Sequence, residues 1–405
     1  MIKKITINQV RRGMYVHAMR GSWIKNPFWA PSFALDSQEI VHKLLASGVQ
    51  ELWIDLEKGL DVAEAASPVP PVPMPAPAES PAPFRFENVQ ASSMADELQH
   101  AARLVKQSKQ AVSDMFDDAR MGRLQNFGSI MPLVEDLASS VLRNPGALVS
   151  LLRLKQADDY TYLHSVAVSA MMVALGKQVG LADAELRECG LAGLLHDIGK
   201  MAIPLEILNK PGRLTDVEFG KVKGHPMAGY DMLASTGSAP PMVLDVCLHH
   251  HEKFDGSGYP HGLKGEDISL HARMGAICDV YDAITSNRPY KAGWCPAESL
   301  RRMADWTKEG HFDPQLFGAF VKCIGIFPVG TLVRLKSGRL AVVVDNSKSL
   351  LQPLVRIFYS TKSMSYIPPL SLDLATAGAL DSIAGREDQE QWGLQDLDRY
   401  WLDAA

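Results

Sequence analysis

The histidines of this chain gather in one stretch of the sequence, which points to a metal site. Nine of the 12 histidines lie between His164 and His311. Two residues of metal-ligand type, His196 and Asp197, are neighbours in the chain. They lie near the end of the apolar segment 185–200, which is predicted to form a buried helix. A buried aspartate is costly unless it is paired or bound to metal. Asp197 therefore fits either a structural salt bridge or a metal ligand.

Five more ligand-type residues occur elsewhere in the same stretch: His164, His225, His250, His251 and Asp279. Taken alone, His164 fits an ordinary core histidine in its apolar helical segment, and His225 fits an ordinary loop residue beside a proline. Four apolar segments nevertheless each carry an imidazole or a carboxylate into what should be core. One shared metal site explains this pattern better than four unrelated structural roles.

The residue types narrow the chemistry. Imidazole and carboxylate ligands without thiolate suit iron, manganese, zinc, nickel or cobalt. Seven candidates exceed the needs of one ion with open positions, and they fit two ions bridged by Asp197. Two ions about 3.5–4 Å apart clamp a phosphoryl group and provide hydroxide at neutral pH. The residues therefore favour hydrolysis of a phosphate ester.

Changes in composition divide the 405 residues into four parts. The expected parts are a small α/β or mostly β domain at 1–63, a linker at 64–92, a helical domain at 93–328, and a short β extension with a tail at 329–405. Proline at about every second position of 67–83 makes the linker extended and semi-rigid.

Local patterns predict the elements within these parts. The predicted strands are 4–10, 14–19 and 51–56, with two or three more in 330–357, and the predicted helices include 37–46, 95–115, 133–142 and 162–179. A capping box at Thr215 and Glu218 is expected to begin a further helix.

Composition excludes several functional classes. Charged residues make up 21% of the chain and the net charge is −5, so the chain has no basic field for long nucleic acids. No apolar run is long enough for a membrane span, and the N-terminus lacks a signal-peptide pattern. The 5 cysteines show no CxxC spacing and fit free thiols. We expect a cytoplasmic protein.

Two motifs resemble a known family. The run from His196 to Lys200 has the form of the HD superfamily signature, and the run from His250 to Pro260 matches HHExxDGxGYP at every fixed position. The second motif defines the HD-GYP subgroup. The resemblance implies an all-α catalytic domain that hydrolyses cyclic di-GMP to linear pGpG, to GMP, or to both. It also implies two divalent metal ions, Fe or Mn.

The resemblance assigns roles to individual residues. His164, His196, Asp197 and Asp279 would hold one ion, and Asp197, His225, His250 and His251 the other. Lys200 would stabilise charge at the reacting phosphate or help to protonate the leaving oxygen, although it also fits a lysine that complements a helix C-terminus. Arg288, Lys291 and Tyr259 would contact the substrate. Tyr160 occupies the position where some members carry a glutamate for a third ion. This favours a two-metal site, although Asp158 or Asp159 nearby leaves a third ion open.

The resemblance extends to partners, and alternatives remain. Family members use the loop around Tyr259 to meet diguanylate cyclase domains, and residues 1–60 resemble a small domain of unknown function often found before HD-GYP domains. A homodimer is left open. The alternatives are a non-hydrolysing cyclic dinucleotide receptor, a phosphodiesterase for pGpG or cyclic GMP-AMP, a mononucleotide phosphohydrolase and a scaffolding protein. No metal ligand is missing from the motifs, which disfavours the receptor and the scaffold.

Overall fold

The computed structural model describes residues 2–19, 32–37, 40–41, 44, 49, 51–62, 84–86, 89–154, 160–208, 210, 212–286, 293–346, 349–376 and 381–402. Contacts divide the chain into two compact units, Met1–Ala82 and Pro83–Ala405.

The N-terminal unit contains a four-stranded antiparallel sheet with the order β1-β4-β2-β3. Its elements are β1 (Ile2–Thr6), a 3-10 turn (Ile7–Gln9), β2 (Tyr15–Met19), β3 (Phe33–Ala34) and β4 (Glu51–Asp55). The first strand is shorter than predicted because the Gln9 side chain accepts a hydrogen bond from the Thr6 backbone N–H, which starts the turn. Buried apolar side chains, including Ile5 and Leu52, form the core on one face of this sheet. The predicted helix at 37–46 lies mostly outside the described residues.

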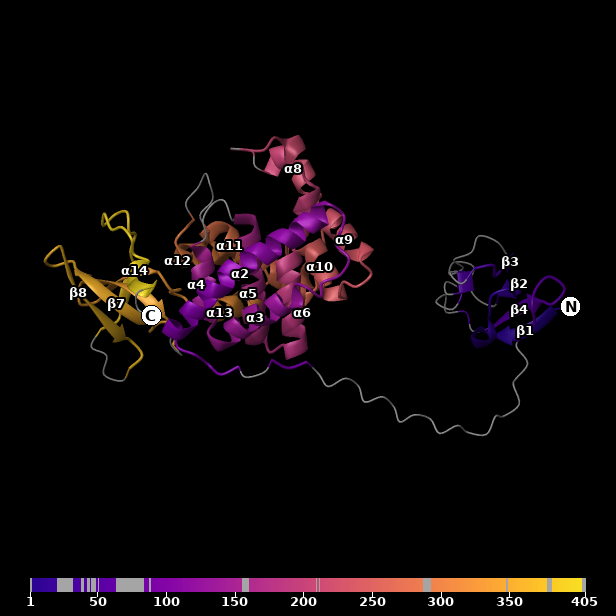
Figure 1. Ribbon diagram of the computed structural model, residues 1–405, viewed down its shortest axis with the longest axis horizontal. Coiled ribbons are helices and arrows are strands. Elements are labelled where there is room, and N and C mark those ends of the chain that lie inside the picture. Colours follow the sequence, from indigo (N-terminus) through magenta and orange to yellow (C-terminus); the bar gives the residue numbers. More distant parts are fainter. Residues whose placement is uncertain are drawn as a thin grey trace. The chain divides into compact units, whose positions relative to one another are not determined.

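The second unit begins with a helical body (Figure 1). Its helices are α2 (Met94–Arg120), α3 (Met131–Arg143), α4 (Pro145–Arg153), α5 (Tyr160–Val179), α6 (Asp183–Leu195), α7 (Leu205–Leu208), α8 (Asp216–Val222), α9 (His225–Ser235), α10 (Pro241–His249), α11 (Leu270–Thr285), α12 (Pro296–Lys308) and α13 (Pro314–Ile324). Short 3-10 turns lie at η4 (Ile198–Ala202) and η5 (Gly265–Asp267). No helix in the described ranges is long and apolar enough to cross a membrane.

Helix α5 lies at the centre of this body. Its residues from Leu163 to Leu175 are all buried, because the segment is apolar around its whole circumference. Helices α3, α4, α6, α11 and α13 all pack against it. A polar side chain on α5 therefore has no solvent to face, which makes His164 dependent on partners inside the protein.

Local signals set several helix boundaries. The Thr215 hydroxyl accepts the N–H of Glu218, so the predicted capping box does begin a helix. Asn144 ends α3 and also caps α4 through the N–H groups of Gly146 and Ala147. The prediction that one helix runs to Lys200 is wrong, because α6 ends at Leu195 and a 3-10 turn follows.

A five-stranded antiparallel sheet closes the second unit, with the order β8-β7-β6-β5-β9. Its strands are β5 (Leu332–Leu335), β6 (Arg339–Asp345), β7 (Leu354–Ser360), β8 (Ser365–Asp373) and β9 (Ile383–Arg386), and α14 (Arg399–Leu402) follows. The prediction of two or three strands missed β8 and β9. Strand β8 contains Pro368 and Pro369, which a strand tolerates only at an edge such as this one. Buried Trp401 of α14 joins an apolar cluster with Met94 and Leu98 of α2, so the sheet packs on the helical body.

Candidate metal centre

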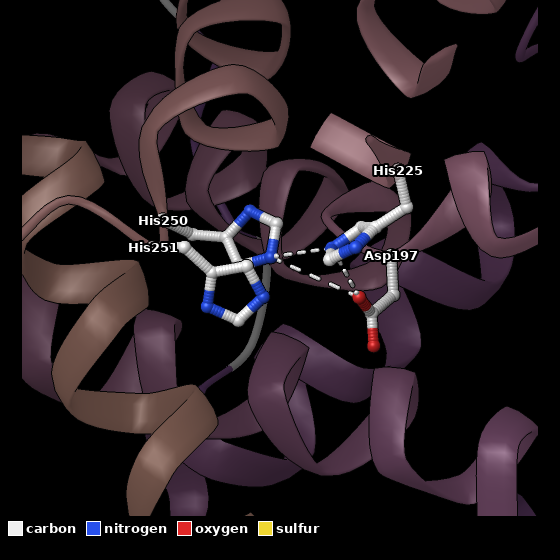
Figure 2. Close-up of side chains that lie close together, drawn as sticks. All are labelled: Asp197, His225, His250 and His251. Atoms are coloured by element: carbon white, nitrogen blue, oxygen red, sulfur yellow. Dashed lines mark hydrogen bonds and ion pairs between the residues drawn. The ribbon is translucent and has the colours of Figure 1, made fainter. Parts of the chain in front are cut away.

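The structure brings the seven predicted ligand residues together from five places in the helical body. His164 lies on α5, His196 and Asp197 follow the end of α6, His225 begins α9, His250 and His251 follow α10, and Asp279 lies on α11. The ligand atoms form two groups, each with all atoms within 4.8 Å of one another: Asp197, His225, His250 and His251 in one, and His164, His196 and Asp279 in the other. Figure 2 shows the first group, with the imidazoles of His225 and His250 directed toward Asp197.

Two glycines allow the elements to approach closely enough. A Cβ atom at Gly193 of α6 would lie 2.7 Å from the Cα atom of Ser169 on α5. A Cβ atom at Gly199 would lie 1.9 Å from the carbonyl oxygen of His225. Only glycine fits at such separations, so these positions set the spacing between the segments that carry His164, His196 and His225. Sterics thus explain why the His196–Lys200 motif has glycine at position 199.

The two oxygens of Asp197 face different groups. Oδ2 lies 3.5 Å from Nε2 of His164 and 3.3 Å from Nε2 of His196. Oδ1 lies 3.2 Å from Nε2 of His225 and 3.8 Å from Nε2 of His250. A carboxylate that faces one set of imidazoles with each oxygen has the arrangement of a bridging ligand. Lys200 Nζ also donates a hydrogen bond to Oδ2 of Asp197.

Asp279 also lies between imidazoles. Its Oδ1 is 3.1 Å from Nε2 of His164, and its Oδ2 is 3.8 Å from Nδ1 of His251. The second carboxylate of the site is therefore in contact with both groups as well.

Hydrogen bonds behind the imidazoles aim them inward. Nδ1 of His196 donates to the carbonyl oxygen of Gly193 at 2.7 Å, and Nδ1 of His225 donates to that of Val222 at 2.8 Å. Nδ1 of His250 likewise lies 3.0 Å from the carbonyl oxygen of Cys247. A protonated Nδ1 leaves Nε2 with its lone pair toward the centre, which is the form that binds metal.

The residues present fit divalent cations. In the described part of the chain, the buried Nε2 of His196 and Oδ1 of Asp197 take part in no hydrogen bond. An unsatisfied buried polar atom costs about 1–3 kcal/mol. A cation beside each of these atoms would remove that cost, and the donor set of imidazole and carboxylate suits a transition metal.

The electrostatics at His250, His251 and Asp197 favour the ligand forms of these three residues. Burial lowers the pKa of His250, and neighbouring imidazoles lower it further, while burial lowers the pKa of His251 to about 4. Burial opposes ionisation of Asp197, but Lys200 and His196 outweigh it and hold the pKa of this carboxyl well below its usual range. Neutral imidazoles and an ionised carboxylate are the forms that coordinate metal.

The loop from Glu252 to Leu263 folds back over His251. The carboxylate of Glu252, only 3% exposed, accepts backbone N–H groups from His261, Gly262 and Leu263 at 2.7, 3.1 and 3.1 Å. The ring of Tyr259 stacks on that of His251, with 4.8 Å between centroids and 29° between planes. The loop thus packs an aromatic side chain directly against a candidate ligand.

Comparisons with known proteins agree with this geometry. An HD domain family model matches residues 132–316, and a model of a domain of unknown function, DUF3391, matches residues 2–129. A cyclic di-GMP phosphodiesterase of Pseudomonas aeruginosa is 53% identical over 411 residues, which span 100% of this chain and 97% of the relative. The chain belongs to the HD-GYP phosphodiesterase family.

Two further relatives match only part of this HD-GYP protein. The cyclic di-GMP phosphodiesterase response regulator of Xanthomonas campestris pv. campestris is 40% identical over 43% of this chain and 47% of its own length. A 3'3'-cGAMP-specific phosphodiesterase of Vibrio cholerae is 37% identical over 40% of this chain and 38% of its own length.

Two residues of the HD-GYP site were not among the predicted site residues. Asp282 Oδ2 lies 2.7 Å from Nδ1 of His164 and so orients this imidazole. Asp282 follows Asp279 by about one turn of α11, so helix periodicity is a signal that would have placed both on one face. Glu252 lies within the HD-GYP signature itself. It holds the loop through hydrogen bonds from backbone N–H groups, and a sequence pattern does not predict such contacts.

Some of the predicted site residues lie outside the described part of this HD-GYP protein. These are Arg288 and Lys291. Asp158, Asp159 and the side chain of Tyr160, which bear on a third ion, lie outside it as well. Of the other predicted residues, Lys200 lies against Asp197 and Tyr259 lies against His251.

Proposed function

We propose that this protein is a metal-dependent phosphodiesterase that hydrolyses cyclic di-GMP to linear pGpG, to GMP, or to both. The observation that carries the proposal is Asp197, whose two oxygens face two separate groups of imidazoles. The full-length relative in Pseudomonas aeruginosa, which is named a cyclic di-GMP phosphodiesterase, supports the choice of substrate.

The proposed ligand sets share Asp197. His164, His196 and Asp279 complete one site, and His225, His250 and His251 complete the other. Iron or manganese is the proposed metal, because imidazole and carboxylate without thiolate suit both. When bound, two such ions neutralise the phosphate and activate water at neutral pH.

The remaining roles belong to side chains around the ions. Lys200 is proposed to stabilise charge that develops on the phosphate or to help protonate the 3′ oxygen that leaves, and its hydrogen bond to Oδ2 of Asp197 supports this role. Tyr259, packed on His251, offers an aromatic face at the edge of the site. Arg288 and Lys291 are proposed to bind substrate phosphates because cations, and the arginine fork above all, suit phosphate oxygens.

A second candidate substrate is 3'3'-cyclic GMP-AMP. The relative in Vibrio cholerae that is named for this substrate is 37% identical over 40% of this chain. Docking of diguanylate cyclase domains on the loop of Tyr259, and a homodimer, stay predictions.

The direct test is turnover of cyclic di-GMP by anaerobically purified protein loaded with Fe(II) or Mn(II). We expect hydrolysis by the wild type, loss of it in Asp197→Ala, and retention in Asp231→Ala, an exposed aspartate on α9. Chromatography of the products distinguishes pGpG from GMP. Tight binding of cyclic di-GMP without turnover in either metal form would refute the phosphodiesterase proposal and favour a receptor. Faster turnover of cyclic GMP-AMP than of cyclic di-GMP would favour the second substrate.

A further inference from the structure

Helix α8, which precedes the candidate ligand His225 in the chain, exposes apolar side chains. Helix α8 buries none of its residues and projects from the helical body (Figure 1). Its exposed side chains include two large apolar ones, Val217 at 73% and Phe219 at 48% exposure. The helix ends just before His225, so this surface lies close along the chain to a candidate metal ligand.

A series of contacts links this surface to the site. Nζ of Lys223 lies 5.1 Å from the ring centroid of Phe219 and 5.2 Å from that of Tyr259. Tyr259 in turn stacks on His251. Lys223 therefore lies between an exposed aromatic ring on α8 and the aromatic ring that stacks on His251.

No carboxylate in the described part of the chain neutralises the charge of Lys223. Within the described ranges, its ammonium group forms no salt bridge and no hydrogen bond, and its side chain is exposed. A cation over an aromatic face is attracted by the negative face of the ring. An ammonium group in such a contact still offers N–H donors to an acceptor on a ligand.

We propose that Phe219 and Lys223 form a subsite for a guanine base of the substrate. This inference rests on the proposed function, which requires two purine bases to lie beside the metal centre. Phe219 supplies a face on which a base stacks. Lys223 donates to O6 and N7, the two acceptors that guanine presents on one edge. Adenine carries an amino donor in place of O6, so the same cation disfavours it and selects guanine.

The test measures binding separately from catalysis. The probes are hydrolysis-resistant phosphorothioate analogues of cyclic di-GMP and cyclic di-AMP, and calorimetry on the metal-loaded full chain gives each Kd. Lys223→Met is expected to raise the Kd of the guanine analogue about tenfold and that of the adenine analogue by less than about twofold. Phe219→Ala is expected to raise both about tenfold, because stacking does not depend on the base. Lys221→Met changes an exposed lysine of α8 two residues before Lys223; this variant is the matched control and should change neither Kd.

Several results would overturn the subsite. These are equal Kd changes for both analogues in Lys223→Met, no change in Phe219→Ala, or the same change in the Lys221→Met control. A wild type that binds neither analogue would overturn it as well. Failure of the proposed function looks different: the guanine analogue would bind with the predicted variant pattern, but cyclic di-GMP itself would not be hydrolysed.

Discussion

Replacing Glu252 with alanine removes the carboxylate that holds the loop over His251. Oε1 accepts the N–H groups of His261 and Gly262, and Oε2 accepts that of Leu263. The close packing of this loop leaves little room for adjustment, since a Cβ atom at Gly258 would lie 2.3 Å from the backbone nitrogen of Lys253. We expect the loop to detach from the metal centre in Glu252→Ala and Tyr259 to lose its stacking position.

The size of the effect follows from the three hydrogen bonds. Each bond to a charged acceptor contributes about 1.5–3 kcal/mol when its donor is otherwise unsatisfied. His261 and Gly262 are exposed, so water replaces part of the loss at these two donors. We therefore expect Glu252→Ala to lower the free energy of unfolding by about 2–3 kcal/mol in all. That corresponds to a fall of roughly 3–6 °C in Tm for a domain of this size.

A second substitution separates the two oxygens. In Glu252→Gln the amide oxygen still accepts from two of the donors, whereas the amide nitrogen opposes the N–H of Leu263. The loss should then be about 1 kcal/mol. Glu266→Ala removes an exposed carboxylate nearby and should change the stability by less than about 0.5 kcal/mol.

The assay combines thermal unfolding with steady-state kinetics well below Tm. Because Tyr259 is proposed to contact the substrate, Glu252→Ala should raise KM for cyclic di-GMP more than it lowers kcat, and Glu252→Gln should restore most of the difference. A Tm of Glu252→Ala equal to that of the wild type would show that the carboxylate does not hold the loop. Equal falls in kcat/KM for both variants would refute the positioning argument.

Two further predictions concern the helical body. Gly193→Ala places a Cβ atom against the backbone of Ser169 and should lower the free energy of unfolding by about 1–3 kcal/mol, with loss of bound metal. Gly318→Ala has open space at its Cβ and should be neutral or stabilising in the same unfolding and metal assays. Burial opposes ionisation of Glu97, but the hydrogen bonds that Arg143 donates lower the pKa of this carboxyl. The ionised Glu97 therefore stabilises the folded protein above the unfolded pKa of about 4.3, and this contribution is lost as the pH falls through the folded pKa. Glu97→Gln should then lower Tm at pH 7, with the gap narrowing below about pH 4, and a constant gap down to pH 3 would contradict this.

The sequence was informative about the site because burial and ligand type conflict in it. A histidine or aspartate in an apolar segment is costly unless something binds it. His164 on α5 and Asp279 on α11 both show this conflict, and the structure places their side chains 3.1 Å apart. Their role as metal ligands is still a prediction, but their proximity is what one shared site requires.

The features that the sequence did not predict depend on contacts between distant segments. No helix-breaking residue marks the end of α6 at Leu195. The close packing of the next turn on His225, which Gly199 allows, depends on a distant segment. Strand β8 carries two prolines that argue against a strand unless its place at the sheet edge is known. The contacts of Lys223 with Phe219 and Tyr259 likewise join two segments whose proximity no local pattern indicates.

The most direct measurement of the central claim is the number of metal ions per chain in anaerobically purified protein. We expect about two ions in the wild type. We expect loss of both in Asp197→Ala, because one oxygen of this residue faces each group of imidazoles, and about two ions in Asp231→Ala. A single ion in the wild type, or full occupancy in Asp197→Ala, would contradict the bridged two-metal centre.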